Sequence, residues 1–405
     1  MKRRLIIGTA AAVLAAAAVT AAIAVFIPRT RPDVQTMSVA LYPYLPDSDA
    51  FEQAVGDCWR TKHPDVGLEF KEWDCYYNEP TEDTDVFVFD ALYFAHFVKE
   101  GYLLPVPADR ISDSDDIIAY AAEGLRSDGT VYAVPQLLCT DLLYTRKEDT
   151  ELSGVRDIDT LYEKLGDRVK DTERPANAEG LLADLSWEMT KTVMYMDAMC
   201  DSSGEYFGCE PVPDLDSISP EALEAVRRIR RMGGATQVNY VSEGGDSFER
   251  ARWFAQGSGR AYIGFSESMS AMGSAAEDME LRTFSYTKKK NVPLMFCDAA
   301  AIRSTIPDEK KELAYNLLDT VTCARTMTAA LSGTSEQGVP QYLLPARTSV
   351  YDSLAPGYPI YGKLKEIAEF PENKLFLAGA DVRGFFTRAE ERIPPLVMQD
   401  TSPQK

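Results

Sequence analysis

The sequence predicts an α/β fold with a parallel sheet, arranged as two lobes that several chain crossings join. Three observations lead to this prediction. Short apolar segments typical of strands alternate with amphipathic segments typical of helices near the N-terminus. The middle of the chain, from about 150 to 283, is more helical. Strand-like and helix-like segments return from 292 onward, so the chain builds one lobe, then a second, and comes back. A cleft between the lobes is expected.

The first elements alternate as strand, helix and strand. Residues 38–44, SVALYPY, alternate in polarity and carry aromatic side chains, which predicts a strand. Asp47 and Ser48 can cap a following helix whose apolar residues fall on one face. Residues 66–70 predict the next strand. These three elements begin the pattern of a parallel sheet.

The next strand is apolar throughout. Residues 86–89, VFVF, have the composition of a strand buried on both faces of a parallel sheet, and they end in Asp90. A helix is expected over 91–99, closed by Gly101. This arrangement places an acidic side chain where a strand gives way to a helix.

The second half adds helices and returns to strands. Residues 220–232 predict a helix with the basic run RRIRR, which we interpret as a solvated helix face rather than a phosphate site. Residues 260–265 and 292–302 predict strands, and 307–321 predict a helix with a leucine-rich face. The sequence shows no internal repeat.

Composition and charge limit the possible partners. The chain has 405 residues, of which 45% are hydrophobic and 26% charged, as in an ordinary globular protein. Its net charge is −21, and residues 1–36 carry five basic and one acidic side chain, so the remainder has a net charge of −25. A surface this acidic repels nucleic acid and anionic lipid and favours cationic ligands.

The N-terminus indicates export. A basic MKRR precedes an almost unbroken apolar run over 5–27, long enough for a helix to cross a bilayer. Residues 1–36 are therefore expected to be a signal peptide or a membrane anchor with its linker, and the rest of the chain an exported body. The first cysteine is Cys58, which excludes a lipidated N-terminal cysteine. Contact with a membrane is expected only through this segment.

Seven cysteines leave at least one unpaired thiol in an exported protein. Cys200 and Cys209 flank a short polar segment and could close a loop. Cys58 with Cys75 is a weaker candidate pair. There is no C-x-x-C motif, which argues against a structural zinc site.

Cys139, inside VPQLLCTDLLYTR, is either a small core residue or a nucleophile that needs a base. Histidine is not the expected base, because only His63 and His96 exist and both have the surroundings of surface or packing residues. The segment GFSES resembles a serine nucleophile elbow, but Ser268 replaces its second glycine and no histidine follows. A carboxylate is therefore the expected partner of Cys139.

Acids and aromatic residues occur where the expected strands end. Asp90 ends one strand, Glu267 follows another, and Asp298 follows the apolar VPLMF, while Tyr42 and Tyr44 end the first strand. Each residue alone is explained as a helix cap or a packing residue. Together, at the carboxyl ends of strands, they suit a flat, positively charged aromatic ligand.

Several long segments, in the same order, resemble the thiaminase I (thiamine pyridinylase) family over residues 37–395. They are VALYPYLPD, EFKEWDCY, DVFVFDALYFAHFVKEGYLLP, VYAVPQLLCTDLLYTRK, RARWFAQGSGRAYIGFSESM and VPQYLLPAR. The resemblance implies a two-lobed fold like that of type II periplasmic solute-binding proteins, with the active site in the inter-lobe cleft. It places lobe 1 at 37–142 and 293–345, and lobe 2 at 143–292 and 346–400.

The resemblance also assigns roles to residues of this sequence. It implies that Cys139 is the nucleophile and Glu267 the general base, that Asp90 and Asp298 hold the aminopyrimidine, and that no metal or organic cofactor takes part. The implied aromatic walls are Tyr42, Tyr44 and Tyr76, together with Phe248, Phe265 and Phe296, which stand where the family has phenols. Each phenylalanine keeps the ring and removes a hydroxyl, which puts substrate preference in question.

The implied activity is base exchange on thiamine, in which an amine or thiol takes the pyrimidinylmethyl group and the thiazole leaves. A non-catalytic binding protein for thiamine or a related pyrimidine is the alternative, and Cys139 with Glu267 separates the two because a binder needs neither. A hydrolase that uses water as acceptor cannot be distinguished by sequence. A monomer is expected, because lobes of this kind open and close around a ligand.

Overall fold

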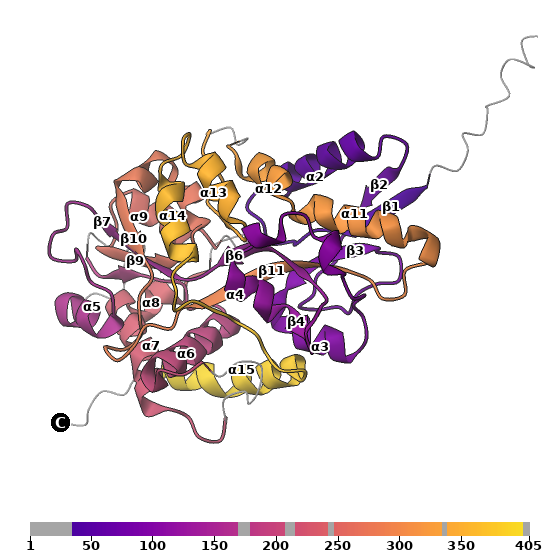
Figure 1. The fold of residues 1–405 in the computed structure, drawn as a ribbon. Coiled ribbons are helices and arrows are strands. Elements are labelled where there is room, and N and C mark those ends of the chain that lie inside the picture. Colours follow the sequence, from indigo (N-terminus) through magenta and orange to yellow (C-terminus); the bar gives the residue numbers. More distant parts are fainter. Residues whose placement is uncertain (1–34, 169–178, 207–214, 242–246, 334–337, 400–405) are drawn as a thin grey trace, which may run out of the picture.

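The structure, a computed structural model, describes residues 35–168, 179–206, 215–241, 247–333 and 338–399. This part of the chain forms two main sheets with helices packed around them (Figure 1). The larger sheet lies at the heart of what we call the first lobe, and the smaller one at the heart of the second lobe. The α/β prediction is confirmed, whereas the lobe boundaries given above stay a prediction.

The larger sheet has the order β12–β6–β11–β3–β1–β2, with β13 paired to β11. Strand β1 is parallel to β2 and β3, as predicted, but β11 is antiparallel to both β3 and β6. The sheet is therefore mixed rather than parallel throughout. Its strands are β1 (Thr36–Ala40), β2 (Gly67–Phe70), β3 (Val86–Asp90), β6 (Val134–Cys139), β11 (Leu294–Ile302), β12 (Leu344–Pro345) and β13 (Lys374–Leu375).

The smaller sheet has the order β10–β7–β9–β8, and a separate hairpin pairs β4 with β5. Strands β6 and β7 belong to different sheets although only Thr140 and Asp141 separate them. The chain thus passes from one lobe to the other directly after Cys139. The remaining strands are β4 (Arg126–Ser127), β5 (Thr130–Val131), β7 (Leu142–Arg146), β8 (Leu181–Leu182), β9 (Ala261–Gly264) and β10 (Met279–Arg282).

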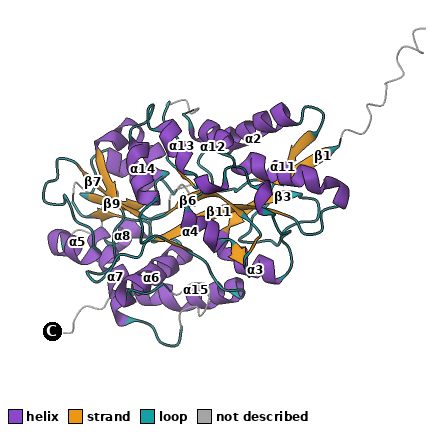
Figure 2. Ribbon diagram, viewed as in Figure 1, coloured by secondary structure: helices purple, strands orange, loops and turns teal. Residues whose placement is uncertain are grey.

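Helices cover the sheets on several sides (Figure 2). They are α2 (Ser48–Lys62), α3 (Phe94–Lys99), α4 (Ala119–Gly124), α5 (Ile158–Leu165), α6 (Glu188–Ser203), α7 (Pro220–Gly233), α8 (Ala235–Val238), α9 (Glu249–Ala255), α10 (Ser268–Met272), α11 (Lys311–Thr322), α12 (Ala324–Leu331), α13 (Thr348–Leu354), α14 (Ile360–Ala368) and α15 (Val382–Met398). Short 3-10 turns are η1 (Ala91–Tyr93), η2 (Ala108–Arg110), η3 (Ser114–Asp116), η4 (Gly273–Asp278) and η5 (Asp308–Lys310).

Local signals in the first lobe work as the sequence predicts, with one correction. The Asp47 carboxylate accepts a hydrogen bond from the Ala50 amide and caps α2. Strand β1, however, ends at Ala40, so Tyr42 and Tyr44 lie in the turn beyond it rather than at its end. The alternation in SVALYPY continues past the last residue that has a pairing partner, which is why it overstates the strand.

Both faces of β3 are buried, as its apolar run predicts. Val86 and Val88 join a core cluster with residues of α2 and α11, such as Trp59 and Leu317. Phe87 and Phe89 belong to the larger cluster on the opposite face. The strand thus has a core on each side, and its carboxyl end at Asp90 is fixed between them.

Helix α15 makes contacts in both lobes. Most of it packs against α6 and α7, where Leu396 accepts hydrogen bonds from Arg227 at 2.8 and 3.0 Å. Near its start, Arg383 donates hydrogen bonds to the carbonyls of Cys75 (2.9 Å) and Tyr76 (2.8 Å) in the first lobe. This helix therefore fixes the loop that carries Tyr76.

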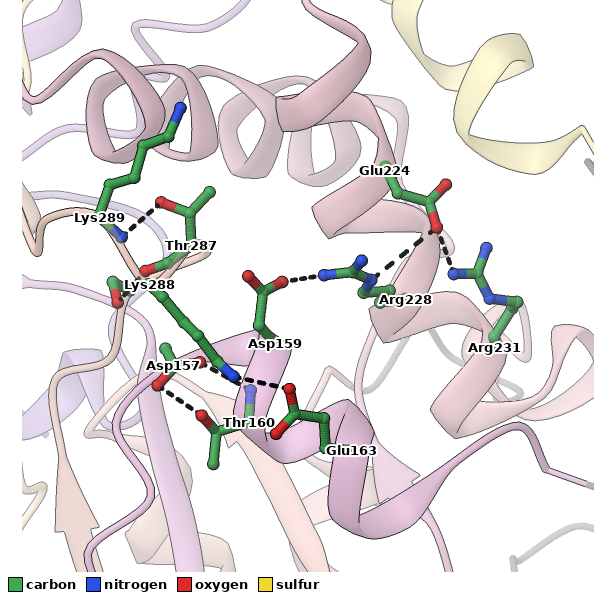
Figure 3. A network of polar contacts seen from close by, with 11 residues as sticks. Asp157, Asp159, Thr160, Glu163, Glu224, Arg228, Arg231, Thr287, Lys288 and Lys289 are labelled. Carbon is green, nitrogen blue, oxygen red and sulfur yellow. Dashed lines mark hydrogen bonds and ion pairs between the residues drawn. The ribbon is translucent and has the colours of Figure 1, made fainter.

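The basic run of α7 is used in packing, so the solvated-face interpretation holds only in part. Arg228 pairs with Asp159 of α5, and Arg231 pairs with Glu224 at 2.5 Å (Figure 3). The side chains of Arg228 and Arg231 are 30% and 25% exposed. Arg228 thus links α7 to α5, and Arg231, which pairs within α7, also lies over the Tyr162 ring of α5.

The cysteine pairing suggested for the first lobe is wrong. Cys58 and Cys75 are both free and buried, and the Cys58 thiol lies beside Thr326 and Cys323 instead. Cys209, the suggested partner of Cys200, lies outside the described residues, as do residues 1–34. No helix in the described ranges is long and apolar enough to cross a membrane.

Removing the Leu317 side chain should test the core behind the larger sheet. Leu317 is fully buried between α11 and the sheet. Leu317→Ala should lower the free energy of unfolding by about 2–5 kcal/mol, because it deletes buried methyl groups and leaves a cavity. Urea denaturation measures the loss. Glu309→Ala, at an exposed position just before α11, should change stability by less than about 0.5 kcal/mol; equal losses would contradict the packing described.

Candidate active site

A cavity of ≈ 320 Å³ is lined by residues of both lobes. It contains every side chain that the sequence singled out for a site. These are Tyr42, Tyr44, Tyr76, Asp90, Cys139, Phe248, Phe265, Glu267, Phe296 and Asp298. The structure thus brings together ten residues that the sequence spreads over more than 250 positions.

Two carboxyl groups face each other across neighbouring strands. Asp90, the last residue of β3, is directly opposite Asp298 on the antiparallel β11. Asp298 therefore lies inside β11, in agreement with the strand predicted over 292–302, and not at the end of a strand. It reaches the same edge because β11 runs antiparallel past the end of β3. A register shift at Asp298 and Ala299 interrupts the pairing with β6, and such irregularities redirect side chains next to sites.

Burial and mutual repulsion hold protons on this pair. Burial raises the pKa of Asp90 to about 6. Burial, and then the charges of Asp90 and Glu267, raise the pKa of Asp298 well above its usual value. Both carboxyl groups therefore hold their protons more readily than a free aspartate does. A pair that shares one proton offers both a hydrogen-bond donor and an acceptor.

Asp90 is both a cap and a site residue. One carboxylate oxygen accepts the amide hydrogen of Leu92 at 2.9 Å and so caps η1. The other accepts the Tyr76 hydroxyl hydrogen at 2.6 Å. The Tyr76 hydroxyl also lies 3.2 Å from that of Tyr42. This chain of polar contacts orients two aromatic rings beside the acid pair.

The tyrosines form a connected wall at the first-lobe side. Tyr44 makes edge contacts with Tyr42 and Tyr76, at ring-centroid distances of 5.5 and 5.8 Å. Its hydroxyl donates to Asp74 at 2.6 Å, and the residue is 54% exposed. Tyr44 therefore lies at the rim of the cavity, whereas Tyr42 and Tyr76 lie within it.

Cys139 ends β6 opposite Phe296 of β11. Burial raises the pKa of the Cys139 thiol well above its usual value, and the charges of Glu267, Asp298, Asp90 and Asp141 add to the effect in that order. The resting side chain is therefore a thiol and not a thiolate. A nucleophilic role requires a nearby base and a change in the local field when a ligand binds.

Glu267 has the properties of that base. It precedes α10, yet its side chain makes no capping hydrogen bond, so the helix-cap explanation fails. Burial raises its pKa to about 7, with a further increase from Asp141, while hydrogen bonds, one of them from Ser266, lower it. A carboxyl group that titrates near neutrality can both accept and return a proton.

The phenylalanines complete the apolar lining. Phe265 and Phe296 meet edge to face at a centroid distance of 5.9 Å, and Phe296 also contacts Phe376. Phe248 lines the cavity from the turn before α9. The rings supply flat apolar surface close to Cys139 without hydroxyl groups.

Other lining residues were not singled out by sequence. Asp141 and Asp184 add two carboxylates, and Trp187, 57% exposed, lies just before α6. Met189 and Met194 belong to α6 itself. Asp141 stands two positions after Cys139, which is the one sequence signal that could have identified it. The α6 residues carried no such signal, because a helix of mixed polarity does not show which face meets a cavity.

Neither histidine lines the cavity. His63 stacks on Trp59 at a centroid distance of 4.3 Å, and the His96 ring nitrogen lies 3.1 Å from Glu79. Both are packing residues, as expected. In the described ranges no group of three or more histidine, cysteine and acidic side chains is arranged to hold a metal ion.

The cavity is strongly acidic. Among the described residues that line it, five are aspartate or glutamate and none is lysine, arginine or histidine. A field of this sign favours a cationic ligand. The site thus combines aromatic walls, a pair of aspartates with raised pKa values, and a thiol and a glutamate in the same cavity.

Comparison with known proteins identifies the chain. Residues 140–287 match the family model described as Thiaminase-1 domain. The curated Thiaminase-1 of Paenibacillus thiaminolyticus is 39% identical over 359 residues, which are 89% of this chain and 87% of that protein. The chain belongs to the thiaminase I family. It is an enzyme of the thiamine-degrading transferase class, which excludes the non-catalytic alternative.

Solved structures agree with this assignment. The Clostridium botulinum thiaminase I in complex with thiamin is 42% identical and superposes with a TM-score of 0.87, covering 90% of this chain and 100% of that one. Thiaminase I from Bacillus thiaminolyticus is 39% identical and superposes with a TM-score of 0.86, covering 89% of this chain and 99% of that one. The GacH receptor of Streptomyces glaucescens, 17% identical with a TM-score of 0.65 and coverage of 92% and 95%, shares only the fold. The type II binding-protein-like fold is thus confirmed for this thiaminase I.

The acidic groups around Cys139 predict how the rate of its alkylation by iodoacetamide depends on pH in the ligand-free enzyme. Because the thiol pKa is raised, alkylation should become fast only at a pH above that of a free cysteine. Glu267→Gln removes the strongest acidic contribution, so the alkylation profile should shift to lower pH. Peptide mapping separates Cys139 from Cys323, the other partly exposed thiol. An unchanged profile would contradict the coupling between Cys139 and Glu267.

Proposed function

We propose that the enzyme cleaves thiamine by base exchange, with Cys139 as nucleophile, Glu267 as general base and an amine or thiol as acceptor. The observation that carries this proposal is that Cys139 and Glu267 line the same cavity and that the Glu267 charge is the strongest acting on the thiol. The pKa of Glu267, about 7, suits proton transfer at neutral pH.

The acid pair supports binding of the aminopyrimidine. That ring presents a nitrogen that accepts a hydrogen bond next to an amino group that donates one. Protonated Asp298 can donate to the ring nitrogen, and ionised Asp90 can accept from the amino group. The rings of Tyr42 and Tyr76 lie beside these carboxyl groups and can pack on the pyrimidine.

The electrostatics support activation of the thiol by the substrate itself. In the empty site four carboxyl groups oppose ionisation of Cys139. Thiamine carries a permanent positive charge on its thiazolium ring, and its binding offsets this field and lowers the thiol pKa. Glu267 then takes the proton, and the thiolate adds to the pyrimidine carbon next to a ring nitrogen. The electron pair passes to that nitrogen, which is not the ring nitrogen beside the amino group that Asp298 contacts.

The group attached to the methylene carbon is then exchanged. Collapse of the adduct breaks the bond between the methylene and the thiazolium nitrogen, and the thiazole leaves with the electron pair as a neutral ring. The incoming amine or thiol adds to the methylene and gives its proton to a base, for which Glu267 is placed. Expulsion of Cys139 as a thiolate restores the aromatic pyrimidine. With a neutral amine, the overall reaction releases one proton.

We also propose that the enzyme acts outside the cytoplasm as a monomer, in line with the apolar N-terminal run and with a cavity complete within one chain. Water instead of an amine or thiol as acceptor would make the enzyme a hydrolase without any change in the site.

Turnover of thiamine by the purified protein with aniline or a thiol tests the proposal. Loss of thiamine should accompany release of free thiazole and formation of the pyrimidinylmethyl adduct of the acceptor. Cys139→Ser should form no product, and Glu267→Gln should lower kcat by roughly 10²- to 10⁴-fold. Thiazole release by Cys139→Ser at the wild-type rate would overturn the assignment of the nucleophile.

The pH dependence follows from Glu267. A general base acts only when ionised, so kcat/KM, which reports the free enzyme, should fall as pH drops below about 7. Initial rates from about pH 5 to 9 measure this acid limb. Glu267→Gln should lose the limb as well as most of the rate, and a limb that persists in the variant would assign it to another acid.

Asp298→Ala should weaken thiamine binding while the thiol and its base remain. Alanine has no group that can donate a hydrogen bond to the ring nitrogen, so KM for thiamine should rise roughly tenfold. Steady-state rates measure it. Asp109→Asn, at an exposed position away from the cavity, should leave KM unchanged and controls for the loss of one carboxylate. A similar KM for both variants would contradict the role of Asp298.

A further inference from the structure

Asp141 lines the cavity but has no part in the steps above. It lies in the two-residue connection between β6 and β7, two positions after Cys139. Burial alone raises its pKa to about 7, with no hydrogen-bond contribution. In the described part of the chain its carboxylate makes no hydrogen bond or ion pair. Asp141 is half-buried in the cavity wall. A carboxylate held there without a partner would gain an ion pair from a bound cation.

Other acids of the cavity have a partner among the described residues, which Asp141 lacks, or a role in the proposed pyrimidine contacts. Asp90 accepts hydrogen bonds from Tyr76 and Leu92. Asp184 pairs with Arg250 at 2.9 Å. Asp298 also lacks a side-chain hydrogen bond, but it lies opposite Asp90 and belongs to the proposed pyrimidine pair. Asp141 thus has no partner in the described part of the protein and no role in the proposed contacts with the pyrimidine.

Asp141 lies toward the second lobe. Its charge acts on Glu267 and Tyr262, and also on Asp197 of α6. Asp90 and Asp298 instead act on Tyr42 of the first lobe. The Cys139 thiol is affected by both groups of acids. The nucleophile therefore stands between the pyrimidine pair and Asp141.

The shape of thiamine connects these observations. Its two rings are joined by a single methylene, and the attacked carbon belongs to the pyrimidine. With that ring at Asp90 and Asp298 and its carbon at Cys139, the thiazolium ring must extend away from the pyrimidine pair. The second-lobe side offers apolar surface from Val193 and Met194 of α6, together with the unpaired carboxylate.

We infer that Asp141 forms a leaving-group subsite that pairs with the cationic thiazolium ring of thiamine. This inference rests on the proposed function, because it assumes thiamine as the substrate. The pairing is transient by its chemistry. When the bond to the methylene breaks, the electron pair neutralises the thiazolium nitrogen, and the neutral ring loses its attraction to Asp141. Release of the thiazole is favoured, and the subsite becomes free for the acceptor.

Binding measurements on two protein variants, each with a charged and a neutral ligand, test the inference without turnover. Cys139→Ser, which cannot turn thiamine over, is compared with Cys139→Ser/Asp141→Asn by calorimetry at about pH 8, where Asp141 is largely ionised. The ligands are thiamine and 3-deazathiamin, a neutral analogue with carbon in place of the charged nitrogen. The second substitution should weaken thiamine about tenfold, between the values for exposed and buried ion pairs. It should change the affinity for the neutral analogue less than about twofold.

Two further variants complete the design. Cys139→Ser/Asp109→Asn removes an exposed carboxylate and should change neither affinity. Cys139→Ser/Asp141→Ser repeats the charge removal with a different side chain in case the asparagine variant is unstable, and thermal melting checks both. Equal weakening of the two ligands, or none of either, would overturn the inference. Failure of the proposed function would appear separately, as absence of thiazole release by the protein with Cys139 intact.

Discussion

The site depends on the antiparallel pairing of β11 with both β3 and β6. Backbone register places Asp298 opposite Asp90 on one side of β11 and Phe296 opposite Cys139 on the other. Residues in such pairs have Cα atoms only about 4.5–5.5 Å apart. One strand therefore fixes the distance between the acid pair and the thiol. A shift of one residue would turn these side chains to the other face of the sheet, so the cores on both faces of β3 also protect the geometry of the site.

The second constraint is charge. Five carboxyl groups surround one cavity, with no basic residue among the described lining. Burial raises the pKa values of Asp90, Asp141, Glu267 and Asp298, and neighbouring acidic charges add to the increase for Glu267 and Asp298. The empty site therefore favours protonated carboxyl groups and an un-ionised Cys139 thiol. A cationic ligand offsets this negative charge as it binds. In the proposed mechanism, substrate recognition and activation of the nucleophile are therefore two effects of the same field.

The chain passes from one lobe to the other at the cavity itself. Cys139 is the last residue of a first-lobe strand, and the chain enters the second lobe within two residues, at Asp141. Glu267 comes from the second lobe, after β9. The proposed nucleophile and its proposed base therefore come from segments of different sheets. In the proposed mechanism, a change in the angle between the lobes would alter the distance between these two groups and so link closure to proton transfer.

Local signals in the sequence determined the elements that depend on neighbouring residues. The Asp47 cap, the doubly buried VFVF strand and the helix at 220–232 follow from residue type and spacing, and the absence of a suitable histidine indicated a carboxylate base for Cys139. The tertiary structure decided what depends on distant pairing. It made the larger sheet mixed, placed Asp298 opposite Asp90, left Cys58 and Cys75 unpaired, and brought Asp141 and α6 to the cavity. The physical reason is that strand register, lobe packing and the burial of charge arise from contacts between residues far apart in the chain, which no local pattern of polarity records.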